Sequence, residues 1–162
     1  MKELLLLRHA KSSWNYAVAD RHRPLKEKGI RRMEAMAHKS ANQFQNVTRF
    51  YSSPANRALH TATIALHIWQ FPLDKLIITE TLYSFEAKSV MEFIRNLPNE
   101  HHSVCLIGHN PALSVVAAEL TNKLTQHMPT AAWVKIIFDQ SCWKDVCNGQ
   151  GLWGLPKQLL DE

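Results

Sequence analysis

The chain is poor in cysteine and has no long apolar run. Three of its 162 residues are cysteines, an odd number without the spacing of a metal site. A reducing compartment is the simplest setting for such thiols, and we expect a cytoplasmic protein. The longest apolar run is far shorter than the roughly 20 residues of a membrane-spanning helix. Arg8 also interrupts the N-terminal run too early for a signal peptide. We therefore predict no membrane partner.

Charge is not concentrated in blocks either. The formal net charge is +5, yet the basic residues are scattered along the chain. The densest cluster, formed by Lys26, Lys28, Arg31 and Arg32, has the pattern of a solvated helix face. We expect no nucleic-acid partner, whereas a modest positive balance would attract a phosphorylated or acidic partner.

The sequence also lacks repeats, low-complexity tracts and linkers, so we predict a single domain over residues 1–162. Apolar runs alternate with helical patterns, which is typical of an α/β fold. The expected strands cover residues 3–8, 48–52, 75–79 and 102–107. The expected helices cover residues 25–45, 54–69, 87–96 and 111–122. Residues 131–138 favour a further strand with residues 142–153 as its partner. We therefore predict a three-layer α/β/α sandwich with a mostly parallel central sheet and an antiparallel edge strand.

The most informative feature is an apolar run, Leu4 to Leu7, that stops at Arg8 and His9. The run predicts a buried strand of a parallel sheet. Such a strand ends at the carboxyl edge of the sheet, where open α/β folds bind their ligands. Basic side chains there are well placed to meet an anion. Taken alone, the feature also fits a basic residue and a ring nitrogen that merely end a strand in solvent.

Two further segments repeat this layout. Residues 49–57 predict a strand that runs into a helix, with Ser53 as the N-cap and Arg57 in or just after the first turn. Residues 104–111 predict a strand followed by His109, with Asn110 as the N-cap of the next helix. Helix N-termini bind phosphate-like anions. Three strand ends thus deliver four basic side chains to one edge of the sheet.

These blocks resemble the histidine phosphatase superfamily in their order and spacing. The matching segments are Arg8-His9-Ala10, Ser53-Pro54 with Arg57, and Gly108-His109-Asn110-Pro111. The opening at positions 7–14 is most similar to the SixA-type phosphohistidine phosphatases. The resemblance covers residues 3 to about 122 and implies a phosphoglycerate mutase-like fold. Two secondary matches support the resemblance. Asn15 stands where the mutases have a phosphate-contacting Asn, and Asp20 through Gly29 match with Arg23-Pro24-Leu25 leading into the next helix.

The chemistry of phosphoryl transfer gives these residues roles. His9 is the candidate nucleophile, which would form a phosphohistidine intermediate that water then cleaves. Arg8 and Arg57 offer planar donors to phosphate oxygens, and His109 would bind the dianion as a cation. The expected substrate-binding residues are Arg8, Ser12, Asn15, Arg57, His109 and Asn110. We expect no metal and no cofactor.

The general acid is where the sequence departs from the resemblance. Related phosphatases and mutases usually carry a Glu or Asp shortly after the third strand, where this chain has Ser84. Glu86 is the tentative acid and Glu80 a less favoured one, although both fit ordinary exposed carboxylates. A weak acid would favour phosphohistidine as substrate, because its P–N bond is labile and imidazole leaves easily once it is protonated.

We therefore predict a metal-independent phosphatase that acts on phosphohistidine in a protein, such as a histidine phosphotransfer domain of a phosphorelay. The first alternative is a small-molecule phosphomonoesterase or phosphomutase, whose partner would be a small phosphorylated metabolite. The second alternative is a non-catalytic module that only recognises phosphate.

Overall fold

A six-stranded sheet forms the centre of the computed structural model, which describes residues 1–161. The strands are β1 (Lys2–Arg8), β2 (Arg49–Ser52), β3 (Leu76–Ile78), β4 (Ser103–Gly108), β5 (Trp133–Phe138) and β6 (Gln150–Gly154). Their order across the sheet is β3-β2-β4-β1-β5-β6. The first four strands run parallel, whereas β5 pairs antiparallel with both β1 and β6.

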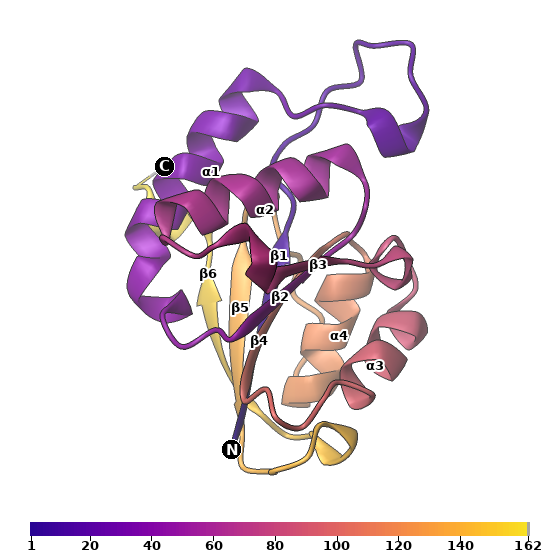
Figure 1. Cartoon of the computed structure of the whole chain (residues 1–162), viewed down its shortest axis with the longest axis vertical. Coiled ribbons are helices and arrows are strands. Elements are labelled where there is room, and N and C mark those ends of the chain that lie inside the picture. The colour runs from indigo at the N-terminus through magenta and orange to yellow at the C-terminus, as the bar shows by residue number, and fades with distance from the viewer. Residues whose placement is uncertain (162) are drawn as a thin grey trace.

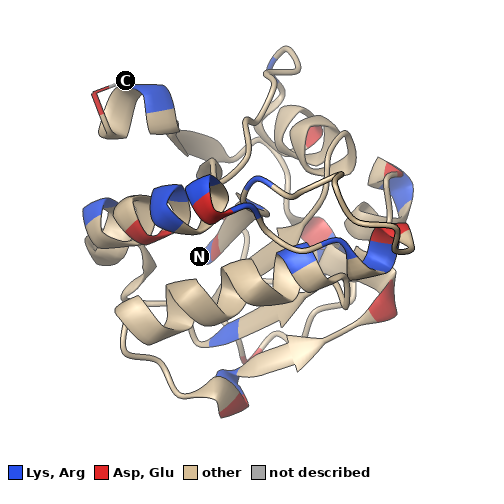
Figure 2. Ribbon diagram, turned by 90° about the horizontal axis from the view of Figure 1, so that it is seen from above, with Lys and Arg blue, Asp and Glu red and all other residues tan. Residues whose placement is uncertain are grey.

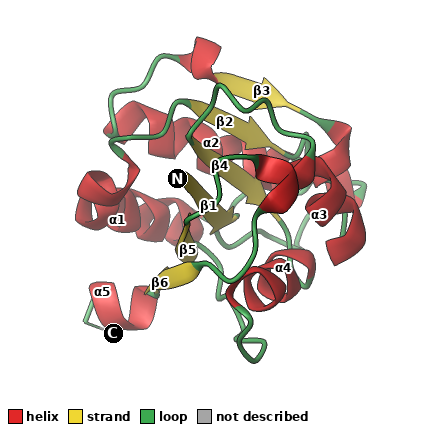
Figure 3. Cartoon of the chain, turned by 90° about the horizontal axis from the view of Figure 1, so that it is seen from below, coloured by secondary structure: helices red, strands yellow, loops and turns green. Residues whose placement is uncertain are grey.

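Helices cover both faces of this sheet (Figure 1). One face carries α1 (Glu27–Phe44), α2 (Asn56–Ile68) and the short α5 (Pro156–Leu159), and the other carries α3 (Ala87–Arg95) and α4 (Ala112–Thr121). Figure 3 shows these three layers from the amino ends of the parallel strands. Short 3-10 turns complete the described elements: η1 (Asp20–His22), η2 (Leu73–Lys75), η3 (Glu80–Leu82) and η4 (Trp143–Asp145). The predicted α/β/α sandwich with a mostly parallel sheet is confirmed.

The buried character of β1 follows from its position inside these layers. Leu4, Leu5, Leu6 and Leu7 are all fully buried. Successive side chains of a strand point to opposite faces, so Leu4 and Leu6 join the core under α3 and α4, and the other two join the core under α1 and α2. Each buried leucine contributes roughly 1.5–3 kcal/mol to the stability of the fold.

The register of the parallel strands brings their carboxyl ends to one level. Arg8, the last residue of β1, pairs with Gly108, the last residue of β4. Ser52, at the end of β2, pairs with Ile107 of β4. The segments that follow these three strands therefore start side by side at the same edge of the sheet.

The antiparallel edge is present as predicted, but its outer strand is short. Residues 142–149 form η4 and a loop instead of extending β6, because Trp143 is fully buried there and donates its indole N–H to the carbonyl of His101 at 2.8 Å. Where β6 ends, Gly154 packs directly on the ring of Trp133, since a Cβ at Gly154 would lie 1.9 Å from Cε2 of that ring.

One smaller difference concerns the start of α2. The helix begins at Asn56 rather than at 54, because Ser53 Oγ accepts the N–H of Ala55 at 3.2 Å in a turn that precedes the helix. The single domain over residues 1–162 stays a prediction. Within the described residues, no helix is long and apolar enough to cross a membrane.

Candidate active site

His9 lies directly beyond β1 and is fixed through its backbone. Its N–H donates to the carbonyl of Gly108 at 3.2 Å, and its carbonyl accepts the N–H of Ala131 at 3.1 Å. The next N–H along the chain, that of Ala10, donates to Thr61 Oγ1 of α2 at 2.9 Å. Strand β4, helix α2 and the segment before β5 thus hold the His9 backbone from three sides.

The His9 ring is buried and neutral. Its Nδ1 lies 2.7 Å from the carbonyl oxygen of Ala10. A carbonyl only accepts hydrogen bonds, so this contact places the ring proton on Nδ1 and leaves the lone pair on Nε2. Burial lowers the pKa of His9 to about 3, and the charges of His109, Arg57 and Arg8 contribute to the same shift. At neutral pH, the ring is therefore neutral, with Nε2 free to act as a base or nucleophile.

His109 lies beside His9, with 5.2 Å between the ring centroids. Its Nε2 is 2.8 Å from Ser53 Oγ, whereas its Nδ1 is buried and has no partner. Burial and the nearby charge of Arg57 lower its pKa to about 4. The sequence predicts a cationic His109, but in the free protein this ring is neutral near pH 7, because it shares a buried site with arginines.

Two arginines from different elements flank the histidines. Arg8, at the end of β1, donates from Nη1 to the carbonyl of Met128 at 2.8 Å. Arg57, in the first turn of α2, is almost fully buried. It donates from Nη1 to the backbone oxygen of Asp20 at 2.8 Å and from Nη2 to Asp20 Oδ2 at 3.1 Å. The Nε atoms of both guanidinium groups are buried without a partner.

Asp20 is the carboxylate of this site, and it is fully engaged. It accepts hydrogen bonds from Arg57, from Arg23 Nε at 3.2 Å and from the Tyr83 hydroxyl. Burial alone would raise the pKa of Asp20, but the bonds from Tyr83 and Arg57 outweigh it and lower the pKa to about 2. This carboxyl group is therefore ionised throughout the physiological range and holds no proton to donate.

These side chains surround a cavity of about 450 Å³. Its lining combines five cationic residues with one carboxylate. The lining residues are Arg8, His9, Lys11, Ser12, Trp14, Asp20, Arg23, Lys26, Arg57, Phe85, His109, Asn110 and Thr130. A cavity with this charge and with buried polar atoms in need of a partner is suited to a small oxyanion. Among residues 1–161, no group of three or more His, Cys, Asp or Glu side chains is arranged to hold a metal ion.

The structure brings together most of the predicted site residues. Arg8, His9, Arg57 and His109 line one cavity with Ser12 and Asn110. Ser12 Oγ accepts a hydrogen bond from Arg23 Nη1 at 2.8 Å. The Asn110 amide donates to the carbonyl of Met128 at 2.9 Å and accepts from Ser114 Oγ at 3.0 Å, so it also fixes the loop beside α4. Asn15 is exposed and does not line the cavity.

Glu86 and Glu80 do not reach this cavity. Glu86 is the exposed N-cap residue of α3, and its N–H is bound by Ser84 Oγ, which turns the backbone toward the helix. Glu80 forms a two-pronged ion pair with Arg21, with both N–O distances at 2.7 Å. Because neither carboxylate lines the cavity, its geometry gives no support to the expected role of Glu86 as general acid.

Several residues of the site are not predicted from the sequence. Asp20 and Arg23 stand out only through the resemblance of residues 20–29, and Tyr83 has no local signal at all. Arg23 lies under the ring of Trp14, with 3.5 Å between its guanidinium carbon and the ring centroid. These side chains meet only because the loop after β1 folds back over α2.

Known proteins share both a part of the sequence and the fold of this chain. Residues 4–83, about half of the chain, match the Histidine phosphatase superfamily (branch 1). No curated protein matches the sequence. The chain is similar to the solved structure of the protein histidine phosphatase SixA complexed with tungstate, with 24% identity over 97% of this chain and 99% of that chain and a TM-score of 0.83.

Two metabolite phosphatases have a related structure. A mycobacterial glucosyl-3-phosphoglycerate phosphatase in complex with VO3 shares 14% identity over 96% of this chain and 98% of that chain, with a TM-score of 0.69. The alpha-ribazole phosphatase from Shigella flexneri shares 18% identity over 86% of this chain and 92% of that chain, with a TM-score of 0.68.

The fold and the cationic pocket define an α/β enzyme that handles oxyanions at the carboxyl edge of its sheet. The family match begins in β1 and includes His9, Asp20 and Arg57, and the likeness in fold extends over nearly the whole chain. The chain belongs to the histidine phosphatase superfamily. The predicted phosphoglycerate mutase-like fold and the prediction of a phosphatase are confirmed at this level.

Proposed function

We propose that the protein is a metal-independent phosphatase that uses His9 as its nucleophile, and that its substrate is phosphohistidine on a protein such as a histidine phosphotransfer domain. The observation that carries the proposal is a neutral, buried His9 with a free Nε2 in a pocket lined by five cationic side chains. Its fold is similar over nearly the whole chain to that of a solved protein histidine phosphatase.

In the proposed reaction, His9 Nε2 attacks the phosphorus in line with the bond to the leaving group. The P–N bond to the substrate imidazole breaks while a bond from Nε2 to phosphorus forms. The phosphoryl oxygens bind Arg8, Arg57 and His109, whose buried Nε and Nδ1 atoms lack partners in the protein. A bound dianion would raise the pKa of His109 and so strengthen its contact. Water then attacks the phosphohistidine and releases phosphate.

The state of the carboxylates supports phosphohistidine as the substrate. An alkoxide leaves slowly unless an acid protonates it, but Asp20 is held ionised by Tyr83 and Arg57, and Glu86 lies outside the pocket. An imidazole with a pKa near 6.5 is already a good leaving group when it is protonated in solution. The site is thus better suited to cleave a P–N bond than a phosphate ester.

A small-molecule phosphomonoesterase or phosphomutase is the second candidate. The observation in its favour is that structural neighbours include phosphatases named for glucosyl-3-phosphoglycerate and for alpha-ribazole. A phosphate-recognition module without catalysis is the third, and the neutral His9 base in the pocket argues against it.

The test measures phosphate release in EDTA from a phosphorylated histidine phosphotransfer domain and from p-nitrophenyl phosphate. We compare wild type with His9→Gln, with Glu86→Gln and with His60→Gln, an exposed histidine of α2 that serves as a matched control. We expect release from phosphohistidine to be fast, to be lost in His9→Gln and to be unchanged in the other two variants. When the substrate carries a radiolabelled phosphoryl group, an alkaline quench should trap the label on the wild-type protein and not on His9→Gln.

Other results would select another candidate. Fast hydrolysis of p-nitrophenyl phosphate that depends on Glu86 would mean that this carboxylate reaches the leaving group and that the substrate is an ester. Phosphate binding without turnover would leave a recognition module. Activity that survives in His9→Gln, or that vanishes in EDTA, would remove the proposed mechanism.

A further inference from the structure

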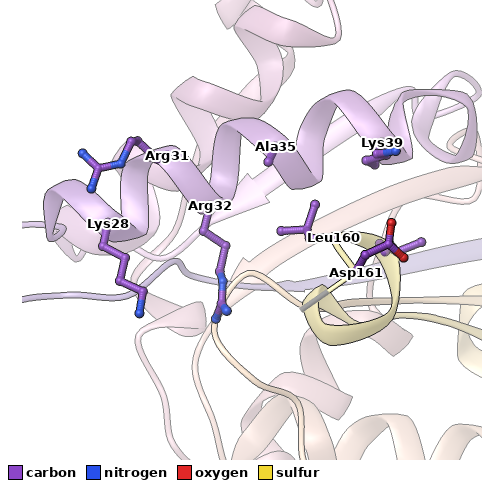
Figure 4. A pocket seen from close by; sticks show the side chains of 8 residues that line it. Lys28, Arg31, Arg32, Ala35, Lys39, Leu160 and Asp161 are labelled. Carbon is purple, nitrogen blue, oxygen red and sulfur yellow. The ribbon is translucent and has the colours of Figure 1, made fainter.

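A second cavity, outside the active-site pocket, lies between α1 and α5. It has a volume of about 460 Å³ and is lined by Lys28, Arg31, Arg32, Ala35, Lys39, Leu159, Leu160 and Asp161. Four of these residues are cationic and one is a carboxylate. In Figure 4, the Lys28 and Arg32 side chains extend from α1 on the side where α5 lies, whereas Arg31 points away from it. We call this cavity the α1 groove.

The helix sorts its charges between two faces. Residues 28, 32, 35 and 39 recur at intervals of three and four, which places them along one stripe of an α-helix. The acidic Glu34 lines a different cavity, together with His67 and Ile68 of α2. Glu27 pairs with Arg31 at 3.6 Å, at the end of the stripe. Lys28 and Lys39 are exposed on this stripe, so they place positive charge beside an apolar floor made by Ala35, Leu159 and Leu160.

The α1 groove begins close to the active-site pocket. Lys26, which lines that pocket, directly precedes α1, and its N–H donates to the carbonyl of Lys11 at 2.9 Å. Gly29, in the first turn of α1, packs against the same carbonyl. Figure 2, which views the carboxyl edge of the sheet, shows basic positions along this loop and on α1. Cations thus run from the pocket into the groove.

The size of protein interfaces makes the nearness of the α1 groove to the pocket relevant for a protein substrate. A standard interface covers about 800 Å² on each partner, which corresponds to a disc with a radius of roughly 16 Å. A protein that presents a phosphorylated side chain to His9 must therefore cover surface well beyond the pocket. Helix α1 begins at the loop that lines the pocket and rises about 1.5 Å per residue, so Lys39 lies roughly 16 Å along the helix from Lys28. An interface about 32 Å across that covers the pocket with one side therefore also reaches Lys39.

We infer that the α1 groove docks an acidic surface of the protein that carries the phosphohistidine, an inference that rests on the proposed function. Lys28 and Lys39 would face carboxylates of the partner, and the apolar floor would receive its apolar side chains. The groove fits a protein better than a nucleic acid, because none of the described residues that line it has an aromatic ring to stack on a base.

The test is the double charge reversal K28E/K39E, which alters two exposed lysines outside the active-site pocket. The matched control is K88E/R95E, which makes the same change in net charge on two exposed residues of α3. Each protein is assayed on a phosphorylated histidine phosphotransfer domain and on phosphoramidate, a small P–N substrate, at low and at physiological salt. Binding of a single-stranded RNA oligonucleotide is measured alongside.

We expect K28E/K39E to raise KM for the phosphorylated domain by about 10-fold at low salt, with kcat unchanged, and K88E/R95E to change it much less. Salt should reduce the difference, and turnover of phosphoramidate should be equal in all three proteins. Equal effects of the two double variants, or no effect of either, would overturn the docking site. RNA binding that is lost in K28E/K39E, without a change in KM, would replace the protein partner by a nucleic acid. Failure of wild type to cleave phosphoramidate would count against the proposed function instead.

Discussion

At the scale of single residues, burial decides the charge of both histidines in the pocket. His9 and His109 share a site with Arg8 and Arg57, and both rings are buried together with Arg57. A proton on either ring would be poorly solvated and repelled by the arginines, so both rings stay neutral near pH 7. The arginines thus have two effects. They would bind the phosphate, and their charges help to keep Nε2 of His9 unprotonated before the substrate binds.

A dependence of stability on pH follows from this burial. The unfolded chain binds a proton at His9 near pH 6.5, whereas the folded protein binds it only near pH 3. Between these pH values the unfolded state holds more protons than the folded state. The contribution of a neutral His9 to the free energy of unfolding is therefore fully present above pH 6.5 and is lost as the pH is lowered toward 3. At pH 5, His9 alone should reduce the free energy of unfolding by about 2 kcal/mol relative to pH 7.

Urea unfolding at pH 7 and pH 5 measures this effect. The His9→Gln variant should lose about 2 kcal/mol less than wild type between the two values, because glutamine does not titrate. His60→Gln removes an exposed histidine instead, and it should keep the dependence of wild type. Identical curves for His9→Gln and wild type would show that the folded state accepts the proton.

At the scale of elements, the loop between β1 and α1 does more for the site than its local pattern indicates. It supplies Ser12, Asp20 and Arg23, which join α2 to the pocket through hydrogen bonds. Its path depends on how closely α1 approaches it. Gly29 permits this approach, since a Cβ there would lie 2.3 Å from the carbonyl oxygen of Lys11.

Gly29→Ala should therefore destabilise the protein, although alanine is normally about 1 kcal/mol better than glycine inside a helix. We expect a loss of roughly 1–3 kcal/mol, because the methyl group must push α1 away from the backbone of the pocket loop. Denaturant unfolding measures the loss, with Lys88→Ala on the exposed face of α3 as the control. A gain in stability for Gly29→Ala would mean that the loop moves aside at little cost.

At the scale of the whole molecule, two apolar cores share one sheet. Trp133 belongs to the core under α1 and α2, and Trp143 belongs to the core under α3 and α4. Because β1 and β4 contribute side chains to both cores, neither core is complete when the sheet is broken. This arrangement favours a single cooperative unit.

The predicted single domain can be tested on that basis. The double variants Trp69→Phe/Trp133→Phe and Trp143→Phe/Trp153→Phe each remove the tryptophans of one core, so that the fluorescence change reports mainly on the opposite core. We expect both variants to show one unfolding transition each, with a midpoint that agrees with far-UV circular dichroism of the same variant. Two separate midpoints within one variant would indicate two units that unfold independently.

The sequence alone determines much of the scaffold of this protein. The leucine run of β1, the strands that precede Ser53 and His109, and the antiparallel pair at the end of the chain are all visible as local patterns, because each depends on apolar spacing over a few residues. The convergence of Arg8, His9, Arg57 and His109 also follows, since parallel strands place their carboxyl ends at one edge.

Only the tertiary structure decides which polar side chains complete the pocket. The partnership of Asp20 with Arg57 and Tyr83 joins a loop, a helix and a 3-10 turn that are far apart in sequence. The same holds for the exposed position of Glu86 and for the groove between α1 and α5. Such contacts are set by how loops close over a finished sheet, and no local period in the sequence records that geometry.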